Sequence, residues 1–237
     1  NIKNLKNIET VGLAMHIGSQ LTSIEPFRNS FLRLREVAKS LMASGHNIMR
    51  LDLGGGLGIP YAGTTTPDLS EYGQLVNEIL GELSCELIFE PGRLIVGNAG
   101  VLITKVIFIK AGDKKNFVIV DAAMNDLLRP SLYGARHEVV TVSQLTKGNP
   151  DGAQHPIDLV GPICETGDSF GSQLTLAPVN AEDLLAIRSA GAYGAVMSST
   201  YNSRPLIPEV LVKGNEFKVI RERIKTDTLL SYEKMPH

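Results

Sequence analysis

The sequence predicts an α/β unit followed by a mostly β domain, and two observations lead to this fold class. In the first hundred residues, short apolar runs alternate with segments whose apolar residues recur every three or four positions. This alternation of strand and helix patterns is typical of a parallel sheet. After about Gly100, short apolar runs separated by turn residues dominate. We therefore expect two domains, residues 1–99 and residues 100–237.

Three strands and two helices are expected in residues 1–99. The strands are predicted in the runs TVGLAMHIG (10–18), IMRLDLGGG (48–56) and CELIFEPGR (85–93), of which the third is expected to be buried. The first helix is predicted between Ser23 as N-cap and Gly45 as C-cap. The second is predicted over 68–83, with an apolar face of six residues. These residues are Leu69, Tyr72, Leu75, Val76, Ile79 and Leu80.

The second domain is expected to consist mainly of short strands. Two of them lie on either side of a turn at 112–115, in the segment VLITKVIFIKAGDKKNFVIVDAAM. Further strands are predicted over 137–145, 155–163, 191–199, 209–214 and 216–224. One segment, NAEDLLAIRSAG (180–191), has helical spacing and predicts a helix.

Composition and charge disfavour several classes of function. The net charge of −2 gives no electrostatic reason to expect nucleic acid or an anionic membrane as partner. No apolar run reaches the length of a membrane span. The two cysteines, Cys85 and Cys164, cannot form a disulfide framework, and no CxxC pair suggests zinc. No metal site is predicted, and the cytoplasm is the expected compartment.

All three predicted strands of the first domain end in residues with binding chemistry. The strand ends carry His16 to Ser19, Gly54 to Gly56, and Glu90 to Arg93. Ligands of parallel α/β folds bind at the carboxyl ends of the strands. Alone, the histidine could be a packing residue and the glycines a tight turn, but their joint placement favours a shared ligand.

The glycines favour an anion, because residues without Cβ let backbone N–H groups approach phosphate oxygens closely. A dinucleotide site is disfavoured. Its GxGxxG pattern has Ile59 in place of the third glycine, and Pro60 and Tyr61 prevent a helix from starting there.

The second domain has its own polar loop, GPICETGDSF. A thiol, Cys164, stands there beside the carboxylates Glu165 and Asp168, between glycines, which favours a functional loop over core packing. For Cys85, inside a strand run, core packing is the better interpretation. A second polar segment, DAAMNDLLRPSLYGARHEV, has three candidates for which solvated loop charges are the alternative: Arg129, Tyr133 and Arg136.

Six motifs occur in the order and approximate spacing of the diaminopimelate decarboxylase family. They are MHIGSQ, LDLGGGLGIPY, FEPGRLIVGNAGVLITKV, DAAMNDLLRPSLYGARHEV, GPICETGDSF and GAYGAVMSSTYNSRP. The chain resembles this family from Val11 to beyond Glu209. CETGD together with MNDLLRPSLYGA is similar to the diaminopimelate enzymes rather than to their ornithine or arginine relatives.

This resemblance implies a pyridoxal-phosphate enzyme built like alanine racemase, with a (β/α)8 TIM-like barrel followed by a β domain. Residues 1–99 would be the last three strand–helix units of the barrel, and residues 100–237 the domain with the substrate and catalytic loop. The implied reaction is decarboxylation of meso-2,6-diaminopimelate to L-lysine and CO2, the last step of lysine biosynthesis.

No segment corresponds to the Schiff-base lysine of the family, which sits on an early barrel strand. We therefore expect this chain to be the C-terminal part of a longer protein, inactive alone, and assign no lysine here to that role.

The resemblance implies cofactor contacts at the strand ends. His16 would stack on the cofactor ring, and Glu90 would bond its nitrogen, because a carboxylate there favours the protonated, electron-accepting form. Tyr193 would contact cofactor and substrate. The phosphate would be held by Ser19, by the turn Gly54, Gly55 and Gly56, and by the backbone of Glu90, Pro91, Gly92 and Arg93.

The substrate and catalytic roles are implied in the same way. Arg93, Arg129 and Tyr133 would grip the distal carboxylate, because guanidinium groups bind carboxylates bidentately. Glu165 would take the distal ammonium. Cys164 would return a proton to Cα, since a thiol is an acid at neutral pH. The catalytic residues that the resemblance implies are Cys164 and His16.

The family's cysteine loop enters a partner's active site, so the resemblance also implies a homodimer with shared sites. Two alternatives stay open: a related ornithine- or arginine-type decarboxylase or racemase, and a non-catalytic homologue that binds pyridoxal phosphate. Arg129 and Glu165 distinguish the diaminopimelate enzyme from the ornithine- and arginine-type decarboxylases, because a diamine-forming enzyme has no distal carboxylate to bind.

Overall fold

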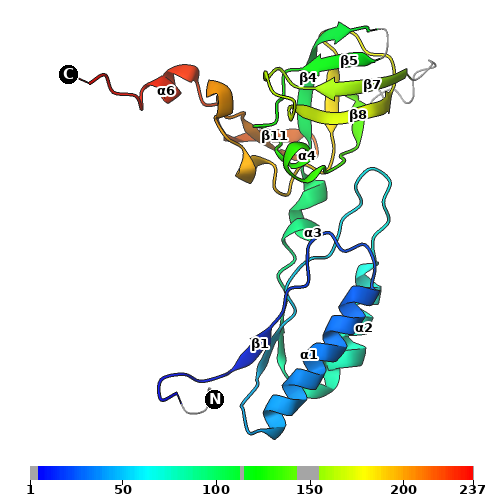
Figure 1. Ribbon diagram of the computed structural model, residues 1–237, viewed down its shortest axis with the longest axis vertical. Helices are drawn as coiled ribbons and strands as arrows, with labels where there is room; N and C mark the ends of the chain where they lie inside the picture. Colours follow the sequence, from blue (N-terminus) through cyan, green and yellow to red (C-terminus); the bar gives the residue numbers. More distant parts are fainter. Residues whose placement is uncertain (1–4, 113–114, 143–154, 237) are drawn as a thin grey trace. The chain divides into compact units, whose positions relative to one another are not determined.

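A computed structural model describes residues 5–112, 115–142 and 155–236. The chain divides into two compact units, Asn1–Gly97 and Asn98–His237, and each is considered by itself (Figure 1). Residues 113–114 of the expected turn and residues 143–145 of the expected strand lie outside the described residues.

The first unit contains a parallel three-stranded sheet in the order β1–β2–β3, which confirms the three predicted strands and their direction. Each strand is shorter than its apolar run, so that His16 and Ile17 lie beyond the first strand instead of inside it. The strands are β1 (Gly12–Ala14), β2 (Arg50–Asp52) and β3 (Glu86–Ile88).

Two amphipathic helices, α1 (Glu25–Ala43) and α2 (Leu69–Leu80), lie side by side in this unit (Figure 1). Their aromatic side chains interlock, with the ring of Tyr72 meeting Phe27 edge-on at a centroid distance of 5.2 Å. Burial of each large apolar side chain contributes about 1.5–3 kcal/mol. The core also includes Phe31, Leu34, Ala38, Leu51, Leu53, Leu75, Val76, Ile79 and Leu80.

The helix ends differ from the predicted ones. The N-cap of α1 is Ile24, although the hydroxyl of Ser23 accepts a hydrogen bond from the N–H of Glu25 at 3.4 Å. Gly45 lies one residue beyond the C-cap, with a φ of +80° that suits a residue without Cβ. Leu69 is 58% exposed, not buried, because it is the first residue of α2.

The prediction that the third strand is buried was wrong. β3 is an edge strand of the described sheet and has a neighbour on one side only. As a result Ile88 and the following Phe89 keep 37% and 45% of their surface exposed.

The second unit is built on a six-stranded mixed sheet in the order β6–β9–β4–β5–β7–β8. Neighbours are antiparallel except for the parallel pair β5–β7. The outer strands β6 and β8 contact each other, so the sheet is nearly closed (Figure 1). The strands are β4 (Leu102–Lys110), β5 (Asn116–Val120), β6 (Val139–Thr141), β7 (His155–Val160), β8 (Ser169–Leu176) and β9 (Leu184–Ile187).

The other elements are short. A hairpin of β10 (Glu209–Lys213) and β11 (Glu216–Arg221) turns at Gly214, whose φ is +60°. Among the described residues, every helix is too short or too polar to cross a membrane. The short helices are η2 (Gly81–Leu83), α3 (Gly92–Val96), η3 (Gly97–Ala99), α4 (Arg129–Tyr133), η4 (Ala195–Met197), η5 (Tyr201–Ser203) and α6 (Thr226–Leu230).

Two predictions in the second unit were wrong. The helix expected over 180–191 is instead the strand β9, whose residues 185–187 are fully buried between β4 and β6. β9 pairs with β4 on one side and with β6 on the other, and these tertiary contacts outweigh the helical spacing of its apolar residues. The strand expected over 191–199 is a turn that includes η4. The strand β8 and the helix α4 were not predicted.

Candidate functional site

Backbone hydrogen bonds join the three strand ends of the first unit. The N–H of Met15 donates to the carbonyl of Asp52 (3.0 Å), and the N–H of Glu90 donates to the carbonyl of Gly54 (2.9 Å). The Asp52 carboxylate also accepts the N–H of Gly54 (2.9 Å). The predicted segments at His16, at the glycines and at Glu90 are therefore adjacent.

The glycine turn has no room for side chains. A Cβ at Gly55 would lie 2.2 Å from the carbonyl oxygen of Glu90, and a Cβ at Gly56 would lie 2.2 Å from that of Gly18. Among the described residues, the N–H groups of Gly55 and Gly56 donate to no protein acceptor. Buried backbone donors normally have a partner. Bare backbone with spare donors suits phosphate, so these residues fit a phosphate-bearing cofactor.

A side chain that sequence reasoning missed fastens this turn. The amide of Gln20 donates from Nε2 to the carbonyl of Ile59 (2.6 Å) and accepts from the Ile59 N–H at Oε1 (3.2 Å). The N–H of Leu21 adds a bond to the carbonyl of Gly56 (2.9 Å). Ser19, which directly precedes Gln20, is exposed. Only the position of Gln20 within MHIGSQ could have indicated its role.

The side chains of His16 and Glu90 are exposed, and among the described residues none bonds to the Glu90 carboxylate. Pro91–Gly92 lead into α3, whose Arg93 donates from Nη1 to the phenolic oxygen of Tyr61 at 2.8 Å. The Arg93 guanidinium carbon lies 5.8 Å from the centre of that ring. Tyr61 is buried and therefore orients the arginine, a role that the sequence did not reveal.

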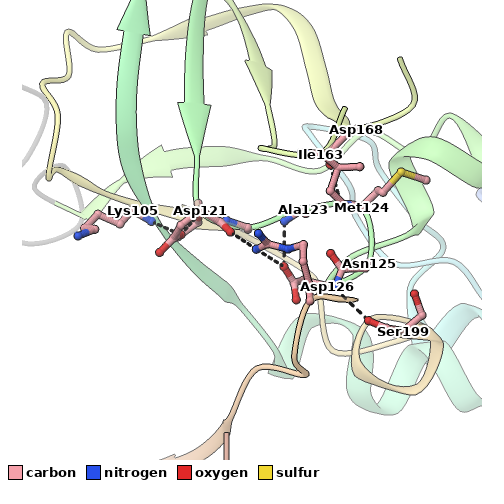
Figure 2. Close-up of polar contacts among 12 residues, drawn as sticks. Lys105, Asp121, Ala123, Met124, Asn125, Asp126, Ile163, Asp168 and Ser199 are labelled. Atoms are coloured by element: carbon pink, nitrogen blue, oxygen red, sulfur yellow. Dashed lines mark hydrogen bonds and ion pairs between the residues drawn. The ribbon is translucent and has the colours of Figure 1, made fainter. Parts of the chain in front are cut away.

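In the second unit, Cys164 and Glu165 are exposed on the loop 161–168. The loop is organised by Asp168, which is 3% exposed. Its two carboxylate oxygens accept the N–H groups of Met124 and Ile163, each at 2.6 Å (Figure 2). Burial raises the pKa of Asp168, and the two backbone donors partly offset that rise.

Tyr201, also missed from the sequence, donates a hydrogen bond to Oε2 of Glu165 at 2.6 Å. The bond and the charge of the carboxylate raise the pKa of the Tyr201 phenol. The nearby Ser199 is held by Asn125 through two bonds of 3.0 Å, its N–H donating to the Asn125 carbonyl and its carbonyl accepting from Nδ2 (Figure 2). The loop 161–168, through Asp168, and the segment 199–201, through Ser199, therefore both contact the DAAMND loop, residues 121–126.

The DAAMND loop is itself fixed to the sheet. Oδ1 of Asp121 accepts from the hydroxyl of Thr104 (2.7 Å) and from the N–H of Lys105 (2.8 Å). At the other end, Asp126 lies 3.9 Å from the guanidinium of Arg204 (Figure 2). Burial raises the pKa of Asp126 more than its hydrogen bond from Ala123 lowers it. The DAAMND loop is thus bonded to β4 at one end and lies beside Arg204 at the other.

Arg129 is 6% exposed, which contradicts the solvated-charge alternative. Its Nη1 lies 3.0 Å from Nε2 of His137, whose Nδ1 lies 2.9 Å from the carbonyl of Arg188. Both contacts fit a neutral imidazole protonated on Nδ1, which accepts from the arginine. Tyr133 and Tyr193, in contrast, are 65% and 43% exposed.

The helix α4 is next to the cysteine loop, since the Ser131 hydroxyl donates to the carbonyl of Gly167. Arg136 is exposed. The predicted residues are thus divided between the two units, and each set is described within its own unit. The first contains His16, Ser19, Gly54, Gly55, Gly56, Glu90, Pro91, Gly92 and Arg93, and the second contains Arg129, Tyr133, Cys164, Glu165 and Tyr193.

Residues 19–191 match the family described as "Pyridoxal-dependent decarboxylase, C-terminal sheet domain". The diaminopimelate decarboxylases of Neisseria meningitidis serogroup B and Zymomonas mobilis are 50% and 46% identical over 217 and 230 residues. These alignments cover 92% and 96% of this chain but 51% and 53% of the relatives. The chain thus spans about half the length of the curated relatives it matches.

A solved structure shows the same fold. The crystal structure of diaminopimelate decarboxylase from Helicobacter pylori, complexed with L-lysine, superposes with a TM-score of 0.88 at 39% identity. The match covers 98% of this chain and 56% of that one.

Proposed function

Because the chain belongs to the pyridoxal-dependent decarboxylase family, we propose that it is the C-terminal half of a diaminopimelate decarboxylase. The complete enzyme converts meso-2,6-diaminopimelate to L-lysine and CO2. Residues 1–99 form the last three strand–helix units of a (β/α)8 barrel, and residues 100–237 form the β domain. The observation that carries the proposal is the adjacency of His16, the glycine turn and Glu90 at three parallel strand ends.

Pyridoxal phosphate, when bound, supplies the electron sink for the electron pair that CO2 leaves behind. The chain would hold it with the spare N–H groups of Gly55 and Gly56 on the phosphate. Glu90 would keep a proton on the ring nitrogen, and its freedom from other side chains in the described residues supports this role. The imidazole of His16 would pack on the ring face.

The second unit supplies most of the proposed contacts to the substrate, and Arg93 of the first unit is a further candidate. Glu165 binds the distal ammonium, for which an exposed carboxylate is suited. Arg129 binds the distal carboxylate, with Arg93 and Tyr133 as further candidates. The exposed thiol of Cys164 gives a proton to Cα after CO2 leaves.

Two expectations about the whole enzyme belong to the same proposal. In a homodimer, the loop with Cys164 and Glu165 completes the active site of a second copy, and the exposure of both side chains is compatible with this. The enzyme works in the cytoplasm.

The test compares Cys164→Ser with Cys85→Ser in the full-length protein, by CO2 release and lysine formation from diaminopimelate. Cys164→Ser should lower kcat on the order of 10²-fold with cofactor still bound, because an alcohol is a poorer acid than a thiol. Cys85→Ser should leave kcat unchanged, since its sulfur faces the carbonyls of Ile48 and Leu83.

Each other result has a distinct meaning. An unchanged kcat in Cys164→Ser would remove this thiol as the acid. A full-length protein that decarboxylates arginine or ornithine, but not diaminopimelate, would replace the proposed function by the related one. A protein that binds pyridoxal phosphate without decarboxylating any of the three would be the non-catalytic homologue.

A further inference from the structure

We propose that Asp168 is a positioning residue, which holds the loop carrying Cys164 and Glu165 in its working geometry against the DAAMND loop. The inference deepens the proposed function, and rests on it only in taking Cys164 and Glu165 as substrate-facing. Asp168 itself is not a catalytic residue. It is 3% exposed, and each of its carboxylate oxygens already accepts a backbone N–H.

The side chain and the backbone of Asp168 bind different parts of the site. The carboxylate accepts from Met124 in the DAAMND loop and from Ile163, which directly precedes Cys164. The backbone N–H donates to the carbonyl of Glu165 (3.1 Å), and the backbone carbonyl accepts from Gly161 (3.0 Å). One residue therefore closes the loop 161–168 on itself and joins it to a second segment.

The Asp168 carboxylate packs directly against the backbone of Gly161. A Cβ at Gly161 would lie 2.3 Å and 2.4 Å from its two oxygens, so only glycine is compatible with this arrangement. Hydrogen bonds from backbone N–H groups to a carboxylate are stronger than those to a neutral acceptor. An amide in the same place would turn an NH2 group toward one of the two backbone donors, which leaves that donor unpaired.

A continuous series of hydrogen-bonded and neighbouring residues leads from Asp168 through the DAAMND loop and back to Glu165. Met124 is followed by Asn125, which is bonded to Ser199 (Figure 2). Two residues later, Tyr201 bonds to the Glu165 carboxylate. The loop is thus held on one side through its backbone by Asp168 and on the other through the side chain of Glu165. Loss of the Asp168 bonds should displace Cys164 and Glu165 together.

The experiment uses Asp168→Asn in the full-length protein loaded with pyridoxal phosphate. Hydrogen–deuterium exchange of peptides covering 161–168 should accelerate about tenfold, because the loop loses one of its two bonds to the residue 168 side chain, from Ile163 or from Met124. The kcat for diaminopimelate should fall about 10²-fold, since small displacements of catalytic groups cost this much. The affinity for pyridoxal phosphate should stay within about twofold of the wild-type value, because independent sites affect each other by no more than this.

Asp158→Asn is the matched control. Asp158 is also buried in the same unit, with 6% exposed against 3% for Asp168, and its carboxylate accepts from Ser172 and from the N–H of Gln173, outside the loop. This variant should lose stability while keeping the exchange of 161–168 and kcat. A kcat loss of equal size in both variants would reduce Asp168 to a general stabiliser and overturn the inference.

Gly161→Ala provides a second variant in case Asp168→Asn does not fold. It leaves the carboxylate in the chain but displaces it, and the same faster exchange and lower kcat are expected. If exchange and kcat match the wild type in either folded variant, the inference is wrong. If the wild-type protein does not decarboxylate diaminopimelate, the proposed function fails, and the exchange data alone decide whether Asp168 positions the loop.

Discussion

The phenolic oxygen of Tyr201 lies 2.6 Å from Oε2 of Glu165, a carboxylate that comes 36 residues earlier in the chain. The two belong to separate segments of the second unit, and their bond fixes the direction of the carboxylate. The same bond raises the pKa of the Tyr201 phenol. In the proposed function, in which Glu165 binds the distal ammonium, this bond would orient the carboxylate before the substrate arrives.

Tyr201→Phe should raise KM for diaminopimelate about three- to tenfold with little change in kcat, because a single hydrogen bond to a charged group is lost. Steady-state kinetics of the full-length protein measure both constants. The control is Tyr232→Phe, a tyrosine that is 77% exposed. In Glu165→Gln, absorbance titration should find the Tyr201 pKa lower than in the wild type. Equal KM values in the Tyr201 variant and the wild type would contradict the orienting role.

Arg129→Ala should raise KM for diaminopimelate about 10- to 100-fold while cofactor affinity is maintained, because bidentate guanidinium–carboxylate bonds are strong. The variant should also melt at a lower temperature, since a buried side chain beside His137 is removed. His137→Asn separates the two effects: it disturbs the same contact but keeps the arginine, so KM should change much less. Arg129 would lose its substrate role if its alanine variant bound diaminopimelate as well as the wild type.

Gly55→Ala should weaken binding of pyridoxal phosphate at least about tenfold, because the new Cβ would lie 2.2 Å from the carbonyl oxygen of Glu90 and must separate two strand ends. Fluorescence titration of the full-length protein measures the affinity. Gly73→Ala is the control: Gly73 lies inside α2 with nothing within 4 Å of a Cβ. It should stabilise the protein by about 0.5–1 kcal/mol and leave cofactor binding unchanged. Tight binding by Gly55→Ala would exclude the glycine turn as the phosphate site.

Asp158 should make stability depend on pH in acid. The hydrogen bond from Ser172, the N–H of Gln173 and the ammonium of Lys115 together lower its pKa to about 2. Since the folded state favours the charged form, the contribution is complete above the ordinary pKa of 3.8 and is lost as the pH falls through about 2. A shift of this size corresponds to about 2 kcal/mol.

Urea unfolding of wild type and Asp158→Asn between pH 7 and pH 2 tests this contribution. The wild type should be the more stable by about 2 kcal/mol at neutral pH, and the difference should shrink in acid. A difference that stays constant over the whole range would show that the charge of Asp158 does not matter. The same variant also serves as the matched control for Asp168.

Local patterns in the sequence determined much of the first unit. Helical spacing of apolar residues indicated α1 and α2, since this period places them on one face whatever the rest of the chain does. The apolar runs indicated three strands, and their motifs marked the ends that the backbone bonds bring together. The glycine run was interpreted from the sequence as a site of close backbone approach to an anion, because glycine has no Cβ. That Glu90 and Gly18 leave no room for a Cβ there was decided by the fold.

Tertiary structure alone decided the remainder. NAEDLLAIRSAG has helical spacing but forms β9, because strands β4 and β6 pair with it from both sides. Gln20, Tyr201 and Asp168 act on partners 39, 36 and 44 residues away. No local pattern encodes such contacts, because they depend on the path of the chain between the partners. The sequence thus determined which residues could do chemistry, and the fold decided which neighbours hold them in place, since a hydrogen bond requires two groups within about 3 Å of each other.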